Sequence, residues 1–213
     1  PGSSPLDSEL SHPIINQVCK RAKQKNVPIA AHAYSNQDVL SAINAGVTTI
    51  EHGIWAKPET LNYASKNNIL FTPTIKAAYD ILNHKDLLPT YMVKNAEMVI
   101  SKASSFIKNA KEQHTLLAMG TDAGTPFNYH GDNAKELQYL TEFGLSENEA
   151  IKAATTNPGR HLPKRTKTGL IKEGYSADLL LLTKNPLNDI TAFQHNIKYV
   201  ISKGICINPI KEN

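Results

Sequence analysis

Residues Pro28–Gly53 read PIAAHAYSNQDVLSAINAGVTTIEHG and contain two short apolar runs, each of which carries a histidine near its end. The first run, PIAAHAY, contains His32, and the second, TTIEHG, contains His52. The segment NQDVLSAINAG between them has helical spacing and ends at Gly46, a residue type that often terminates helices. A strand, a helix and a strand in this order predict two parallel strands joined by a crossover helix.

The same alternation extends from about residue 11 to residue 123. Strands are expected over 28–34, 48–53, 69–74 and 116–123, and helices over 12–26, 36–46, 59–68 and 91–114. Two more helices are expected over 133–144 and 146–157, the second of which opens with a capping box formed by Ser146 and Glu149. These intervals indicate an α/β protein whose parallel sheet is covered by helices.

The character of the chain changes after Gly169. Segments 170–175, 177–185 and 197–208 are strand-like, with glycine and Asn-Pro punctuation and no expected helix between them. We therefore predict a boundary near Pro163, with one domain over 1–162 and a small β unit over 163–213.

Composition restricts the classes of function. Of 213 residues, 40% are hydrophobic and 20% are charged, which is typical of a globular protein. The net charge of +4 includes two dense basic runs, at 20–25 and 163–167, which are not interleaved with aromatic residues, so nucleic-acid binding is not expected. The two cysteines are isolated and no apolar run is long enough to cross a membrane, so we expect a cytoplasmic protein without membrane partners.

Three metal-capable side chains fall at the ends of predicted strands. His32, His52 and Asp122 each lie at the carboxyl end of a strand and next to Gly or Ala. Active sites of parallel α/β sheets and barrels lie at that edge, and zinc accepts nitrogen and oxygen ligands. We therefore predict a divalent metal site, with zinc as the expected ion. Taken singly, each histidine could be a structural residue, and Asp122 could start a turn.

Two further residues are candidates for contact with a small-molecule substrate. Tyr34 lies two residues beyond His32 and on the same face of the strand, although a tyrosine at the rim is an equal alternative. His130 lies in the loop GTPFNYHGDN that follows Asp122.

The motifs AHA at His32, AGVTTIEHG at His52 and MGTDAG at Asp122 resemble the metal-dependent amidohydrolase superfamily. The segments AHAYS and TDAGTPFNYHGDNAKEL are most similar to its imidazolonepropionase-related branch, which includes prolidase-like dipeptidases. The resemblance implies strands five to eight of a (βα)8 TIM-type barrel, followed by the C-terminal part of a small β-sandwich. It also implies one or two divalent ions, with His32 and His52 on one ion and Asp122 on the other as the proton-transferring, catalytic residue.

The chain departs from that pattern because it contains no HxH motif and no segment matching the lysine-bearing fourth strand. We therefore expect a C-terminal half that self-associates or pairs with an N-terminal half-barrel. The leading hypothesis is a hydrolase of amide or peptide C–N bonds in dipeptides or N-acyl amino acids, whose activity this truncated form can lack because part of its metal shell is missing. The alternatives are a non-catalytic half-barrel that acts as an assembly or binding module, and a cyclic-amide hydrolase of the imidazolonepropionase type.

Overall fold

The computed structural model describes residues 4–8, 11–162 and 167–209. Its central element is a four-stranded parallel sheet in the order β1-β2-β3-β4. The strands are β1 (Ala30–Ala33), β2 (Thr49–His52), β3 (Leu70–Thr72) and β4 (Leu116–Leu117). Each strand pairs with the next one along the chain, so all four carboxyl ends lie at one edge of the sheet.

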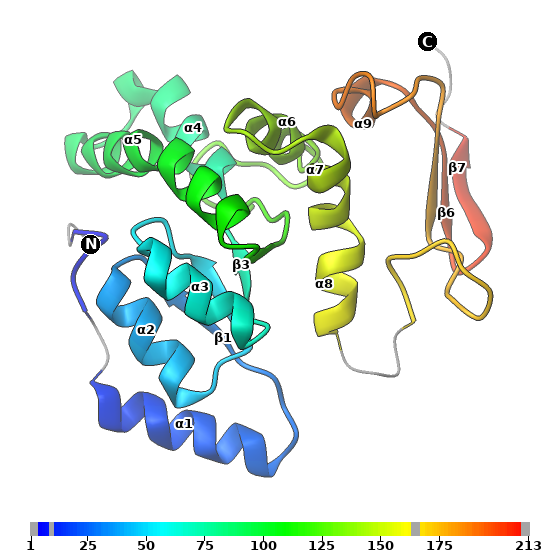
Figure 1. Ribbon diagram of the computed structural model, residues 1–213. Coiled ribbons are helices and arrows are strands. Elements are labelled where there is room, and N and C mark those ends of the chain that lie inside the picture. The colour runs from blue at the N-terminus through cyan, green and yellow to red at the C-terminus, as the bar shows by residue number, and fades with distance from the viewer. Residues whose placement is uncertain (1–3, 9–10, 163–166, 210–213) are drawn as a thin grey trace.

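Helices precede, connect and follow these strands (Figure 1). They are α1 (His12–Gln24), α2 (Asn36–Ala45), α3 (Pro58–Lys66), α4 (Ile75–Asn83), α5 (Thr90–Glu112), α6 (Lys135–Glu142), α7 (Glu147–Ala154) and α8 (Thr156–His161), with a 3-10 turn η1 (Lys85–Leu87) before α5. Helix α2 contacts α1 and α3, α3 contacts α5, and α4 packs against both α5 and α6. In the described part of the chain, no helix combines the length and the apolar character that crossing a membrane requires.

The core lies between the sheet and these helices. Ile50 and Phe71 are adjacent across β2 and β3 and are fully buried, as are Phe106 and Ile107 of α5. Burial of such side chains supplies the main stabilisation of the fold. The edge strand β1 differs because it alternates: Ala33 is buried, whereas Ala30 and His32 are exposed. One face of β1 is therefore uncovered.

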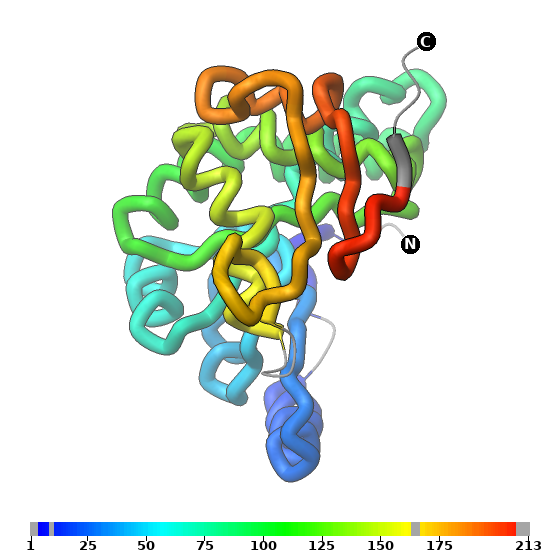
Figure 2. Tube along the Cα trace, turned by 90° about the vertical axis from the view of Figure 1, so that its right-hand side faces the viewer, coloured from blue at the N-terminus to red at the C-terminus, as the bar shows by residue number. Residues whose placement is uncertain are grey.

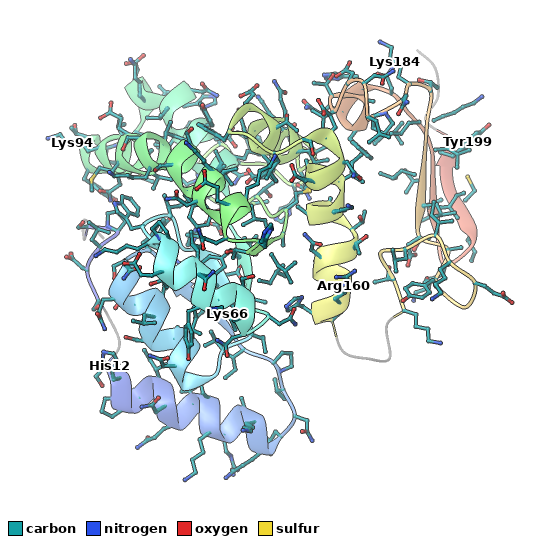
Figure 3. The ribbon with its side chains drawn as sticks, viewed as in Figure 1. His12, Lys66, Lys94, Arg160, Lys184 and Tyr199 are labelled. Atoms are coloured by element: carbon teal, nitrogen blue, oxygen red, sulfur yellow. The ribbon has the colours of Figure 1, made fainter. Side chains whose placement is uncertain are left out.

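A second sheet of three antiparallel strands follows the helices. It consists of β5 (Leu179–Leu182), β6 (Ile197–Ser202) and β7 (Ile205–Pro209) in that order. Helices α7 and α8 stand between it and the parallel strands in Figure 1, and Figure 2 shows it from the front. Figure 3 places Lys94 of α5 and Tyr199 of β6 at opposite sides of the molecule.

The segment before β6 joins this sheet to the rest of the protein. A short helix, α9 (Ala192–His195), lies between β5 and β6. Ile190 and Ala192 are buried, and Ile190 belongs to the main hydrophobic core. Gln194 Nε2 of α9 also donates to Gln138 Oε1 of α6 over 3.2 Å.

The structure confirms four parallel strands and the helices expected between them, and it corrects several details. The strand expected over 116–123 is limited to Leu116–Leu117, so Asp122 lies in the loop beyond it and not at a strand end. Helix α4 was not expected from the sequence. Residues 170–175 are loop and turns, not a strand, and α9 lies where no helix was expected. The boundary predicted at Pro163 lies outside the described residues.

Candidate metal centre and active site

The two histidines predicted to bind metal lie side by side. Because β1 and β2 are parallel neighbours with Ala33 opposite His52, the two imidazoles meet at the carboxyl edge of the sheet. His32 Nδ1 lies 3.1 Å from His52 Nε2, and the ring centroids are 4.6 Å apart. His32 is exposed, whereas His52 is 5% exposed.

Three side chains at this edge share an unusual backbone conformation. His52, Thr74 and Asp122 have φ values of 71°, 54° and 56°, in the left-handed region that residues other than glycine rarely adopt. His52 is the last residue of β2 and Thr74 follows closely after β3, whereas Asp122 lies in the loop beyond β4, which ends at Leu117. Such conformations cost on the order of 1–3 kcal/mol each and cluster at functional sites. Five other non-glycine residues of the described chain also have positive φ, so the strain accompanies the candidate site but does not by itself identify it.

Thr74 orients His52. The Thr74 hydroxyl donates to the Pro73 carbonyl over 2.8 Å, and its oxygen lies 2.6 Å from His52 Nδ1. Because the hydroxyl hydrogen is used on Pro73, the network assigns Nδ1–H of His52 as the donor to Thr74. The Nε2 lone pair of His52 then accepts a hydrogen bond from His32 Nδ1 at 3.1 Å, and a cation bound between the two rings would replace that hydrogen.

Tyr34 shields this imidazole. Its ring stacks on His52 with centroids 4.4 Å apart and planes 4° apart, and meets His32 edge-on at 5.3 Å. Burial, and then the positive charge that His32 could carry, lower the pKa of His52 to about 3, which keeps the ring neutral as a metal ligand must be. Burial and the charge of Asp122 raise the pKa of Tyr34 to about 12, so its phenol stays protonated and can donate a hydrogen bond.

His32 Nδ1 and His52 Nε2 are spaced as two ligands of one metal ion would be. Two ligands at 2.0–2.1 Å from a tetrahedral zinc ion lie about 3.3 Å apart, close to the 3.1 Å between His32 Nδ1 and His52 Nε2. Within the described ranges, however, no group of three or more His, Cys, Asp or Glu side chains is placed to hold one ion. Asp122 therefore does not complete a three-ligand set with the two histidines.

An open cavity of about 750 Å³ adjoins part of the candidate site, although His52 is not among its lining residues. His32, Tyr34, Thr74 and Asp122 line it together with apolar side chains of α4 and α5. His130 is exposed and is not among the lining residues of this cavity, so the structure does not bring it to the other candidates.

A buried polar cluster beside the cavity was not recognised from the sequence. Lys76, Asp80, Asn128 and Glu136 are between 0% and 5% exposed. Glu136 accepts hydrogen bonds from the backbone N–H groups of Ile75 and Lys76, at 2.9 and 2.7 Å, and so caps the first turn of α4. Burial raises the pKa of Glu136 to about 8, against the lowering effect of these two hydrogen bonds.

No local sequence pattern predicts this cluster, because Lys76 is 52 positions from Asn128 and 60 positions from Glu136 in the chain. Asn128 lies in a loop and belongs to no sequence motif that would mark it as a functional residue.

Comparison with known proteins identifies the family. The model of the amidohydrolase family matches residues 6–206, nearly the whole chain. The chain therefore belongs to the amidohydrolase family, and the resemblance carried by the three motifs is confirmed.

Individual relatives agree with this assignment. Ochratoxinase from Aspergillus niger is 27% identical over 204 residues, which cover 90% of this chain and 40% of the relative. A crystal structure of a Xaa-Pro dipeptidase with bound methionine is 30% identical with a TM-score of 0.86, covering 95% of this chain and 50% of the other. A crystal structure of a putative prolidase from Bifidobacterium longum is 29% identical with a TM-score of 0.87, and the match covers 100% of this chain and 54% of the other. The chain spans about half the length of the proteins it matches.

Proposed function

We propose that this chain supplies the C-terminal half of a metal-dependent hydrolase that cleaves amide or peptide C–N bonds in small substrates, of the dipeptide or N-acyl amino acid type. The observation that carries the proposal is the convergence of His32 Nδ1 and His52 Nε2 at 3.1 Å on the carboxyl edge of a parallel sheet. Similarity to a Xaa-Pro dipeptidase and a putative prolidase supports the substrate class.

Each residue has a role in this proposal. His32 and His52 bind one divalent ion, for which zinc suits the nitrogen donors, and Asp122 binds a second ion in the complete enzyme. The ion that these residues would hold would supply a water with a pKa of about 7, and hence a nucleophile at neutral pH. An Asp122 carboxylate oxygen takes the proton of the attacking water and delivers it to the leaving amine nitrogen. Tyr34 donates its phenol hydrogen to the substrate. His130 does not line the cavity, so the substrate contact expected of it from the sequence is given no role in this proposal.

The uncovered face of β1 supports the view that the site is completed by further polypeptide. Ala30 and His32 are exposed although they lie on a strand of the central sheet. In the proposal, four preceding strands of a (βα)8 barrel cover this face, β1 to β4 correspond to strands five to eight, and β5 to β7 form part of a β-sandwich. The proposed domains are residues 1–162 and 163–213.

Metal content and hydrolysis test the proposal. Zinc retained after dialysis is expected in the wild-type chain, and both His32→Ala and His52→Ala should lose it. The matched control is His195→Ala, which removes an exposed histidine of α9 beyond the candidate site. A wild-type chain that retains no metal, or retains it equally in His32→Ala, contradicts the metal site.

Hydrolysis is measured with a panel of Xaa-Pro dipeptides, N-acyl amino acids and cyclic amides. The chain is assayed alone and together with an N-terminal half-barrel of the same family. Activity only on mixing supports a completed barrel, and activity on cyclic amides alone would replace the substrate class. Metal binding without hydrolysis in either assay would favour a non-catalytic assembly module.

A further inference from the structure

Lys76 is a charged side chain at the centre of the buried cluster. It lies in the first turn of α4 and is 1% exposed. Its ammonium forms an ion pair with Asp80 and a second one, at 3.3 Å, with Asp132, and it donates to Asn128 Oδ1 over 3.2 Å. An ammonium has three hydrogens, so these three acceptors use all of them.

The charge of Lys76 is maintained by its partners. Burial acts to lower the pKa of Lys76, but the hydrogen bonds and charges of Asp80 and Asp132 outweigh it and leave the pKa raised. A buried charge that loses its partners is strongly destabilising, so the three acceptors and the ammonium hold one another in place.

Asn128 connects this cation to the candidate catalytic loop. Its side chain is 2% exposed, and its Nδ2 donates to the carbonyls of both Thr121 and Asp122, the latter over 3.1 Å. Two backbone hydrogen bonds close the same loop, from Gly124 N to Asn128 O at 2.9 Å and from Asn128 N to Thr125 O at 3.0 Å. The amide of Asn128 thus holds the peptide units on both sides of Asp122.

Asp122 needs such support because no strand positions it. Strand β4 ends at Leu117, and Asp122 is exposed with a left-handed φ of 56°. A second contact joins the loop to the C-terminal end of α4. The ring of Phe127 stacks on that of His84, with the ring centroids 4.0 Å apart. Helix α4 therefore touches the loop at both of its ends.

We propose that Lys76 is a positioning residue: through Asn128 it fixes the backbone at Asp122 relative to the histidine pair. The same helix begins next to Thr74, which orients His52, so α4 sets the relative placement of both parts of the site. The importance of Lys76 for catalysis rests on the proposed function. The hydrogen-bonded path from Lys76 through Asn128 to the loop does not depend on that function.

Amide hydrogen exchange of the 213-residue chain without added metal tests the link. Lys76→Met keeps the length of the side chain and removes the charge. We expect exchange of the loop amides at 124–128 to become about tenfold faster or more, while amides of β1 and β2 change less than twofold. The matched control is Lys111→Met, which removes the partner of Glu149 on α7 and should leave the loop unchanged.

A double-mutant cycle distinguishes positioning from general stabilisation. If Lys76 acts through Asn128, then Asn128→Leu accelerates the same amides, and the double variant is no faster than the faster single variant. Loop exchange within twofold of wild type in Lys76→Met, uniform acceleration across both sheets, or independent additive effects would each overturn the proposal. Because exchange is read without metal or substrate, absence of metal binding or hydrolysis would instead count against the proposed function alone.

Discussion

His52 Nδ1 and Thr74 Oγ1 form a 2.6 Å hydrogen bond that joins the ends of two adjacent strands. The threonine lies at the junction of β3 and α4, whereas the histidine ends β2. A residue outside the predicted set of ligands therefore fixes both the tautomer and the direction of one of them. Loss of a partner of this kind typically lowers metal affinity about 10- to 100-fold.

Replacing Thr74 should weaken metal binding. Thr74→Val removes the acceptor and leaves a buried N–H of His52 unpaired, which costs about 1–3 kcal/mol of folding stability. Metal affinity should fall about 10- to 100-fold, measured by competition with a chromogenic chelator. Thr74→Ser keeps the hydroxyl and should retain affinity. Thr115→Val, which removes a buried hydroxyl that donates to Leu61 O, should leave metal affinity unchanged.

A side chain at Gly53 should destabilise the fold more than one at Gly46. Both glycines have positive φ, at +70° and +99°, but a Cβ on Gly53 would lie 2.5 Å from the Phe71 ring, whereas one on Gly46 meets nothing within 4 Å. Gly46→Ala should cost about 1–2 kcal/mol for the left-handed backbone. Gly53→Ala should cost about 2–5 kcal/mol because overpacking adds to that strain. Urea unfolding measures both, and equal losses would contradict the contact with Phe71.

Glu149 should make stability depend on acidic pH. Its partial burial acts to raise its pKa, but the hydrogen bonds from Lys111 and from the Ser146 cap lower the pKa from 4.5 to about 2. Because the folded state depresses the pKa, the stabilisation is present above pH 4.5 and is lost as the pH falls towards 2. The difference in unfolding free energy between wild type and Glu149→Gln should therefore shrink from pH 5.5 to pH 3. A difference that does not change with pH would show that the carboxylate charge contributes nothing.

The uncovered face of β1 should drive self-association of the isolated chain. A strand edge and an apolar face without a neighbour are sites of pairing with a second chain. Sedimentation velocity should show dimers or larger species that increase with concentration. Ala30→Lys should reduce them, whereas Asn44→Lys, on an exposed position of α2, should not. A compact wild-type monomer at all concentrations would contradict this expectation.

Local patterns in the sequence were sufficient to predict the strand–helix alternation and the meeting of two imidazoles. His32 and His52 each follow an apolar run, and parallel pairing brings the ends of such runs together. The capping box at Ser146 was also readable, because both of its members lie within one turn.

The parts that were missed depend on contacts between distant segments. Helix α4 starts at a left-handed Thr74 that makes no side-chain cap, and its first N–H groups are satisfied by Glu136, about sixty residues later. No local start signal therefore marks this helix. The link from Lys76 to Asn128 was invisible for the same reason, since only the folded chain brings a helix and a loop residue together.

The order β1-β2-β3-β4 also has a consequence for how the chain acquires its structure. Each strand pairs with the one synthesised just before it, so the sheet can assemble in step with translation and without waiting for remote segments. All residues of the histidine pair and its partner Thr74 have been synthesised by residue 74. The residues that hold the loop of Asp122 and the start of α4, Asn128 and Glu136, are synthesised later. The residues of the histidine pair therefore emerge before those that hold the loop of Asp122, whereas the start of α4 at Thr74 is satisfied only once Glu136 is also present.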